Sequence, residues 1–187
     1  MRKLKLQVQI TLDGFIAGTN GEMDWMKFPW TPDILDYVNG ITEPVDTILL
    51  GRKLAEGFIP HWTAALENPD VEDFPKKMVE TPKVVFTKTF KKSIWENTVI
   101  ATGEIANEVN KLKKQNGKDI IAYGGAKFVS SLIKERLIDE LHLFVNPAVL
   151  GSGLPIFQTV SKKQNYELTH SQSFDCGIIV LVYKQAG

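Results

Sequence analysis

The sequence predicts a single α/β domain in which helices cover both faces of a mixed sheet. The 187 residues suit one domain. Short apolar runs that end at glycine or proline alternate with amphipathic segments over most of the chain, as in a sheet covered by helices. The last two apolar runs are separated only by a tight Asp-Cys-Gly turn, which predicts an antiparallel hairpin at the end of the sheet.

Each element follows from its own pattern. Residues 4–12 alternate apolar and polar side chains, which predicts a half-buried strand ended by Asp13-Gly14. Period two or short apolar runs predict further strands at 47–50, 83–86, 98–101, 119–123, 139–150, 166–174 and 178–183. Helical spacing and turn residues predict helices at 33–41, 71–80, 103–115 and 126–136. In the long strand at 139–150, Asn146-Pro147 indicates a bulge or an edge position.

Composition and charge exclude several classes of protein. Hydrophobic residues make up 43% and charged residues 24%, which excludes general disorder. The 22 basic residues balance 22 acidic ones, so no overall field attracts nucleic acid or an anionic membrane. The single cysteine, Cys176, excludes an intramolecular disulfide and a cysteine zinc cluster. No apolar run is long enough for a membrane span or a signal core, so we expect a soluble cytoplasmic protein.

Three junctions between a predicted strand and the segment after it are suited to holding an anion. The junctions are Gly51-Arg52-Lys53, Thr87-Lys88-Thr89 and Gly124-Gly125-Ala126-Lys127. Glycine lets a ligand approach the backbone closely, and a helix that begins there directs free N–H groups at it. Ligands of such sheets bind at the carboxyl ends of the strands, where all three junctions lie. An extended ligand with several phosphates, such as a dinucleotide, would fit them together, although each glycine alone is also an ordinary turn residue.

Other sites are absent from the sequence. It contains no GxGxxG, GxxxxGK[ST] or GxSxG motif, which argues against a Rossmann site, a P-loop and a hydrolase elbow. The three histidines are scattered without metal-ligand spacing, so we expect no metal site.

Three carboxylates are candidates for a catalytic group, and one of them is expected to line the substrate pocket. They are Asp13, Asp33 and Asp36. Each also has a structural interpretation: Asp13 as part of a turn, Asp33 as a first-turn helix residue and Asp36 as a solvated helix position. Aromatic Trp25, Phe28 and Trp30 lie close to them in sequence and suit either a core or substrate stacking.

Several motifs in order resemble one family. They are 11–17 (TLDGFIA), 21–25 (GEMDW), 50–53 (LGRK), 87–89 (TKT), 124–126 (GGA), 137–141 (LIDEL) and 147–157 (PAVLGSGLPIF). The set resembles the dihydrofolate reductase-like superfamily. Within it, the chain is similar to the C-terminal reductase domain of the bifunctional riboflavin-biosynthesis deaminase-reductase, in its small stand-alone bacterial form.

This resemblance implies an NADPH-dependent reductase with a mixed, roughly eight-stranded sheet between two helical layers, expected to form a homodimer. Ile16 and Ala17 would lie against the nicotinamide, and Trp25 would close a loop over the site. The three junctions would hold the phosphates: the segment 51–53 from a helix start, 87–89 the 2′-phosphate, and 124–127 the pyrophosphate.

The sequence also departs from the riboflavin reductases. Tyr123 stands where they carry a glutamate before the two glycines, and the first predicted helix has no cation for a substrate phosphate. We therefore expect hydride transfer to a small heterocyclic or ribosylaminopyrimidine-like substrate. A dihydrofolate reductase proper and a non-catalytic nucleotide-binding module are the alternatives.

Overall fold

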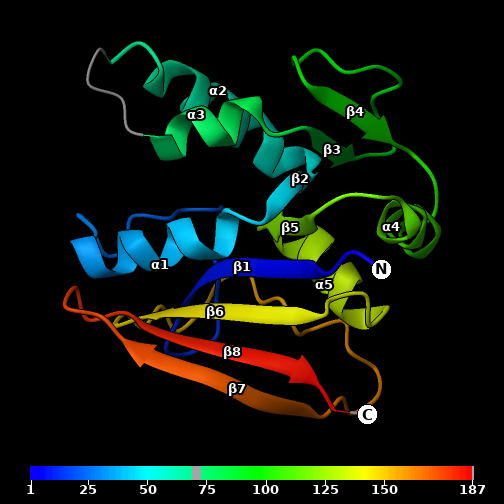
Figure 1. Cartoon of the computed structure of the whole chain (residues 1–187). Coiled ribbons are helices and arrows are strands. Elements are labelled where there is room, and N and C mark those ends of the chain that lie inside the picture. Colours follow the sequence, from blue (N-terminus) through cyan, green and yellow to red (C-terminus); the bar gives the residue numbers. More distant parts are fainter. Residues whose placement is uncertain (69–72, 187) are drawn as a thin grey trace.

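The computed structural model describes residues 1–68 and 73–186, which form one eight-stranded sheet with five helices (Figure 1). The strands are β1 (Leu4–Thr11), β2 (Val45–Gly51), β3 (Lys83–Phe86), β4 (Thr98–Ala101), β5 (Asp119–Tyr123), β6 (Glu140–Asn146), β7 (Tyr166–Ser173) and β8 (Ile179–Gln185). The helices are α1 (Pro32–Thr42), α2 (Arg52–Ala65), α3 (Asp73–Glu80), α4 (Ile105–Lys114) and α5 (Ala126–Lys134). Residues 71 and 72 of the predicted helix 71–80 lie outside the described residues.

The sheet is mixed, as the sequence predicts. Its order is β4-β3-β2-β5-β1-β6-β8-β7, and the first six strands in the chain run parallel to one another. Strand β8 is antiparallel to both β6 and β7, so the terminal hairpin extends the sheet at one end (Figure 1).

Helices cover both faces of the sheet. Apolar residues of α1, α2 and α3 pack on one face, where Ile34 and Val38 contact the β6–β8 side and Ala55 and Ile59 contact β2 and β5. Helices α4 and α5 pack on the other face against β1 and β5. The three-layer α/β/α arrangement is therefore confirmed.

The prediction that the first strand is half-buried is wrong, because β1 lies in the middle of the sheet between β5 and β6. Its apolar residues face α5, and its polar residues are covered from the other side by α1 and its neighbours. Lys5 and Gln7 are each only 7% exposed. A central parallel strand is normally apolar on both faces, so this buried polar face is unusual.

The prediction of a strand over 139–150 is too long, because β6 ends at Asn146. Pro147 has no N–H to continue a ladder, and the N–H of Ala148 turns back to the carbonyl of Asn146. The strand pairs with β1 on one side and β8 on the other, so it is not an edge strand either. The chain that follows is free to approach the loop after β1.

No helix in residues 1–68 and 73–186 is long and apolar enough to cross a membrane. The same residues contain no group of three or more His, Cys, Asp or Glu side chains that could hold a metal ion.

Candidate functional site

The three junctions predicted from the sequence lie at the carboxyl ends of three strands that the sheet places side by side, β3, β2 and β5. Phe86 at the end of β3 packs against Phe128 of α5, with ring centroids 4.9 Å apart. The guanidinium of Arg52 lies 5.8 Å from the centre of the Phe90 ring, just after the segment 87–89. Residues far apart in the sequence therefore form one continuous edge.

Two helices begin next to each other at this edge, and glycine makes their close approach possible. A Cβ atom on Gly51 would lie 2.8 Å from Cβ of Phe128, so a larger residue would push α5 away. A Cβ on Gly125 would lie 3.9 Å from Cα of Gly51, and Gly125 has φ of +90°, which side chains rarely adopt. Neither helix start is capped by a side chain, which leaves backbone N–H groups as donors for an anion.

The cations of this edge are partly paired with carboxylates. Arg52 donates to Glu56 at 2.6 Å on the next turn of α2. Lys88 contacts Glu104 at 3.3 Å and donates to the carbonyl of Thr102 at 2.9 Å. Lys53 and Lys127 are exposed. An incoming phosphate would therefore compete with Glu56 and Glu104 for these groups.

The segment 87–89 forms a compact hydroxyl turn. The hydroxyls of Thr87 and Thr89 lie 3.0 Å apart, and the N–H of Thr89 donates to Oγ1 of Thr87 at 3.1 Å. Both hydroxyls are thus held together, on the residues that flank Lys88 in the sequence. Ala126 opens α5 directly after Gly124 and Gly125, so it contributes its backbone to the neighbouring helix start.

The loop after β1 is attached to the segment after β6. The N–H of Ile16 donates to the carbonyl of Leu154 at 3.0 Å, and the N–H of Leu154 donates to the carbonyl of Ala17 at 2.8 Å. Ile16 and Ala17 are both buried, and Ile16 belongs to the core beneath α5. The indole N–H of Trp25 donates to the carbonyl of Glu22 at 3.2 Å, within a tight 18–22 turn.

The three candidate carboxylates lie in different surroundings. Asp13 accepts from the backbone N–H groups of Leu150 and Gly151, and the Thr11 hydroxyl bonded to it lowers its pKa. Asp33 accepts from the N–H of Asp175 at 3.0 Å, which joins α1 to the turn between β7 and β8.

The hydrogen bond from the Thr31 hydroxyl, followed by the bond from the N–H of Asp175, lowers the pKa of Asp33. Asp36 lies exposed on α1. Asp13 and Asp33 therefore hold the backbone of distant loops in place, whereas Asp36 lies at the surface.

The sequence analysis missed a second set of polar groups, on the face of the sheet beneath α1 and α2. Gln7 is the register partner of Tyr123 on β5 and of His142 on β6, so these three side chains form one row across three strands. Gln9 accepts from the side-chain amide of Asn146 at 2.8 Å, and Asn146 is completely buried. The polar residues at alternate positions of β1 are visible in the sequence. Their alternation, however, indicated a strand with one face in solvent rather than a buried polar face.

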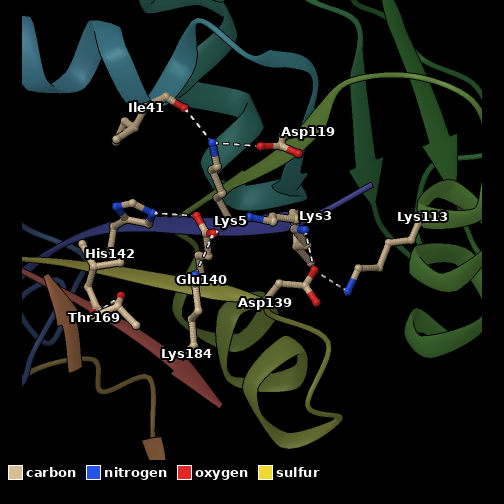
Figure 2. A network of polar contacts seen from close by, with 12 residues as sticks. Lys3, Lys5, Ile41, Lys113, Asp119, Asp139, Glu140, His142, Thr169 and Lys184 are labelled. Atoms are coloured by element: carbon tan, nitrogen blue, oxygen red, sulfur yellow. Dashed lines mark hydrogen bonds and ion pairs between the residues drawn. The ribbon is translucent and has the colours of Figure 1, made fainter. Parts of the chain in front are cut away.

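A separate group of charges lies at the opposite, amino ends of β1, β5 and β6 (Figure 2). Lys5 pairs with Asp119 at 3.0 Å, and Glu140 pairs with Lys3 at 3.0 Å. Contact with the side chain of His142, followed by the cations of Lys3 and Lys5, holds the pKa of Glu140 at about 2. These charges are neutralised by one another and connect the strands away from the glycine edge.

The eight-stranded mixed sheet with its antiparallel C-terminal strands has the fold of dihydrofolate reductase-like domains. The structure of a putative riboflavin biosynthesis protein from Shewanella sp. PV-4 matches with a TM-score of 0.77 over all of both chains at 18% identity. A diaminohydroxyphosphoribosylaminopyrimidine deaminase/5-amino-6-(5-phosphoribosylamino)uracil reductase from Thermotoga maritima matches at 0.70 and 17% identity, over 99% of this chain and 57% of that one. A dihydrofolate reductase from Enterococcus faecalis complexed with NADP(H) matches at 0.63 and 14% identity, over 99% and 97%.

The sequence places the chain more narrowly within this class. It belongs to the RibD C-terminal domain family, whose family model matches residues 2–180. The uncharacterized protein YyaP of Bacillus subtilis (strain 168) is 38% identical over 190 residues, which cover 100% of this chain and 96% of that protein. The resemblance drawn from the sequence motifs is confirmed.

Proposed function

We propose that this protein is an NADPH-dependent reductase that transfers a hydride to a small heterocyclic or ribosylaminopyrimidine-like substrate. The observation that carries the proposal is the pair of helix starts at Gly51 and Gly125, which adjoin at the ends of neighbouring strands. Family membership and the NADP(H) complex of the similar dihydrofolate reductase support it.

The residues present at the edge fit a dinucleotide phosphate. The backbone donors at 51–52 and 124–126 would hold the pyrophosphate, because both helix starts lack a side-chain cap. Thr87, Lys88 and Thr89 would hold the 2′-phosphate with one ammonium and two hydroxyls. Ile16 and Ala17 would border the nicotinamide, and Trp25 would cover it. When bound, NADPH supplies the hydride, and the chain supplies orientation and exclusion of water.

The proton that accompanies reduction needs a donor that is not already an anion. The lowered pKa values of Asp13 and Asp33 keep both carboxylates ionised at neutral pH. Ionised carboxylates at neutral pH are poor general acids. Asp13 and Asp33 therefore suit orientation of the substrate better than proton donation.

The proposal is tested first by cofactor binding. NADPH should bind with a measurable dissociation constant in a fluorescence titration, and Lys127→Ala should weaken it because Lys127 lies in the first turn of α5. Lys134→Ala is the matched control, since it removes a lysine from the last turn of the same helix. If wild-type protein binds no NADPH, the proposed function is wrong.

Turnover then separates the three alternatives. Loss of NADPH absorbance with the ribosylaminopyrimidine intermediate supports the riboflavin-type reductase, and loss with dihydrofolate supports a dihydrofolate reductase. Binding of NADPH without turnover of either compound or of a wider heterocycle panel supports the non-catalytic module.

A further inference from the structure

Asn146 is a completely buried amide at the carboxyl end of β6, a strand that lies inside the sheet between β1 and β8. Burial of an amide costs free energy unless hydrogen bonds replace its contacts with water. An apolar side chain at this position would avoid that cost. The partners of Asn146 therefore indicate what the amide does for the protein.

Both ends of this amide are engaged. Its Oδ1 accepts from the backbone N–H of Lys27 at 2.9 Å. Its Nδ2 donates to the carbonyl of Phe144 at 3.0 Å and to Oε1 of Gln9 at 2.8 Å. A backbone N–H only donates and a backbone carbonyl only accepts, so Lys27 and Phe144 fix the orientation of the amide. A carboxylate or an apolar side chain could not serve both partners.

Gln9 holds the amide from the neighbouring strand. In the register of β1 and β6, Gln9 lies beside Phe144, so it reaches Asn146 diagonally on the same face of the sheet. Its Oε1 accepts the amide hydrogen that the carbonyl of Phe144 leaves free. One polar side chain of β1 thus has a specific task, because Gln9 orients the amide to which Lys27 is bound.

The bond to Asn146 fixes one end of the loop that joins β1 to α1. Close to Lys27, the ring of Trp30 stacks on Phe144 with centroids 6.4 Å apart, and Phe28 stacks on Trp30 at 5.7 Å. The chain from Lys27 to Trp30 is therefore attached to β6 at two points. The stacked rings hold side chains, whereas the bond to Asn146 holds the backbone itself.

The other end of the loop is fixed at Ala17, whose carbonyl accepts from the N–H of Leu154 at 2.8 Å. Residues 18–26 lie between the two attachments and include Trp25. The carbonyl of Glu22 accepts from the N–H of Gly18 at 2.9 Å and from the indole of Trp25 at 3.2 Å. Within the described residues, the loop 18–26 is thus hydrogen-bonded to itself, and its two ends bond it to the rest of the fold.

Both attachments lie at the same edge of the sheet as the two helix starts. They are at the carboxyl ends of β1 and β6, and β1 is the neighbour of β5, whose end carries Gly124 and Gly125. A loop released at Lys27 would be held at this edge by Ala17 alone. The bond from Lys27 to Asn146 therefore decides where the loop 18–26 lies relative to the proposed cofactor.

We infer that Asn146 is a positioning residue for the cofactor site: oriented by Gln9, it holds the loop 18–26 across the nicotinamide half through the N–H of Lys27. This inference rests on the proposed function, which supplies the ligand. Without the anchor, each ligand that lies beneath the loop would have to order it, at a cost in affinity. A ligand that does not reach the loop would bind as before.

Limited proteolysis measures the anchor without any ligand. Trypsin can cut after Lys27, and it cuts conformations in which this stretch has left the sheet. Asn146→Ala should speed cleavage after Lys27 about three- to tenfold, because one hydrogen bond no longer opposes release. Cleavage after Lys92 is the internal reference and should keep its rate, since β2, β5 and β1 separate the segment after β3 from β6.

Two ligands measure the positioning role. NADPH includes the nicotinamide half, whereas adenosine 2′,5′-bisphosphate is the part of NADPH that carries the 2′-phosphate and lacks the nicotinamide. In calorimetric titrations, Asn146→Ala should weaken NADPH about three- to tenfold and leave the affinity for the bisphosphate unchanged. A merely structural role would weaken both ligands or neither.

Two further variants complete the design. Gln9→Leu removes the partner that orients the amide, so it should change both readouts in the same direction by a smaller factor, and it carries both measurements if Asn146→Ala does not fold. Combined with Asn146→Ala it should add nothing, since Gln9 acts on the loop through Asn146. Thr42→Val is the matched control, because it removes a buried, hydrogen-bonded hydroxyl from the last turn of α1 and should change neither readout.

The outcomes are distinguishable from failure of the proposed function. Equal acceleration of cleavage after Lys27 and Lys92 would show general unfolding and overturn the inference, as would equal weakening of both ligands. If wild-type protein binds NADPH and Asn146→Ala alters neither cleavage nor affinity, the inference is wrong while the proposed function stands. If wild-type protein binds no NADPH, the proposed function fails and the positioning role fails with it, and selective cleavage after Lys27 would then show an anchor of the loop alone.

Discussion

Cofactor discrimination can be tested at Lys88. NADPH differs from NADH by one 2′-phosphate, and a chain with zero net charge can favour that dianion only through local cations. We predict that Lys88→Ala weakens NADPH binding and leaves NADH binding unchanged. The reason is that Lys88 stands between Thr87 and Thr89 in the sequence, whose hydroxyls the fold holds 3.0 Å apart, so one ammonium and two hydroxyls belong to the same short turn.

The structure sets the size of the effect. A charge-assisted hydrogen bond contributes about 1.5–3 kcal/mol. Lys88 must first give up its contact with Glu104, and because both side chains are mostly exposed, that pair is worth only about 0–1 kcal/mol. The net loss on Lys88→Ala is therefore about 0.5–3 kcal/mol, which corresponds to roughly two- to 150-fold in the dissociation constant for NADPH.

The same pair supplies a variant with the opposite sign. Glu104→Gln removes the competing carboxylate and should tighten NADPH binding by up to about fivefold. Both dissociation constants are measured by fluorescence titration at one fixed ionic strength, with Lys92→Ala as the control for loss of an exposed lysine nearby. Equal losses for NADPH and NADH in Lys88→Ala, or no loss for either, would show that the 2′-phosphate lies elsewhere.

Three further predictions concern stability, the loop and self-association. The pKa of Glu140, about 2 against 4.5 in the unfolded chain, means that the ionised carboxylate stabilises the fold at pH 7. Glu140→Gln should therefore lower the free energy of unfolding in urea by about 2–3 kcal/mol at pH 7. The difference in stability between wild type and variant should fade as the pH is lowered from about 5 to about 2, because the wild-type carboxylate becomes protonated. A difference that stays constant with pH would contradict this prediction. NADPH should quench tryptophan fluorescence through Trp25, so unchanged quenching in Trp25→Phe would assign the signal to another tryptophan. The chain should form a homodimer through the end of the sheet where Ile179 is 45% and Leu168 is 53% exposed, and a monomer mass in sedimentation at micromolar concentration would disprove it.

The glycine edge illustrates what local sequence predicts well. Gly51 and Gly124-Gly125 each follow a short apolar run, and a buried strand that ends at glycine is a local signal. In a parallel sheet every such junction lies at the same edge, so the sequence indicated a common site. The sequence did not indicate that the backbone of Gly51 lies next to that of Gly125. That contact follows from the placing of β2 next to β5, strands about seventy residues apart in the chain.

The candidate carboxylates show where local reasoning is insufficient. Asp13 and Asp33 are acids next to turns and aromatic residues, which suits catalysis as well as structure. Their partners are the backbone N–H groups of Gly151 and Asp175, more than a hundred residues away. Such a partner depends on how the loops meet, and no local pattern encodes it.

The sequence by itself determined the fold class, the family and the polar or apolar character of each strand face, because hydrophobic periodicity, turn residues and motifs are local properties. Only the tertiary structure decided which faces are buried. Alternation in β1 predicts one wet face for an edge or surface strand, whereas the sheet order places β1 between β5 and β6, beneath helices on both sides. Burial depends on neighbours that are distant in sequence. The glutamines of β1 therefore indicate a solvent-facing side in the sequence, whereas in the folded protein Gln7 is buried in a polar row beside Tyr123 and His142.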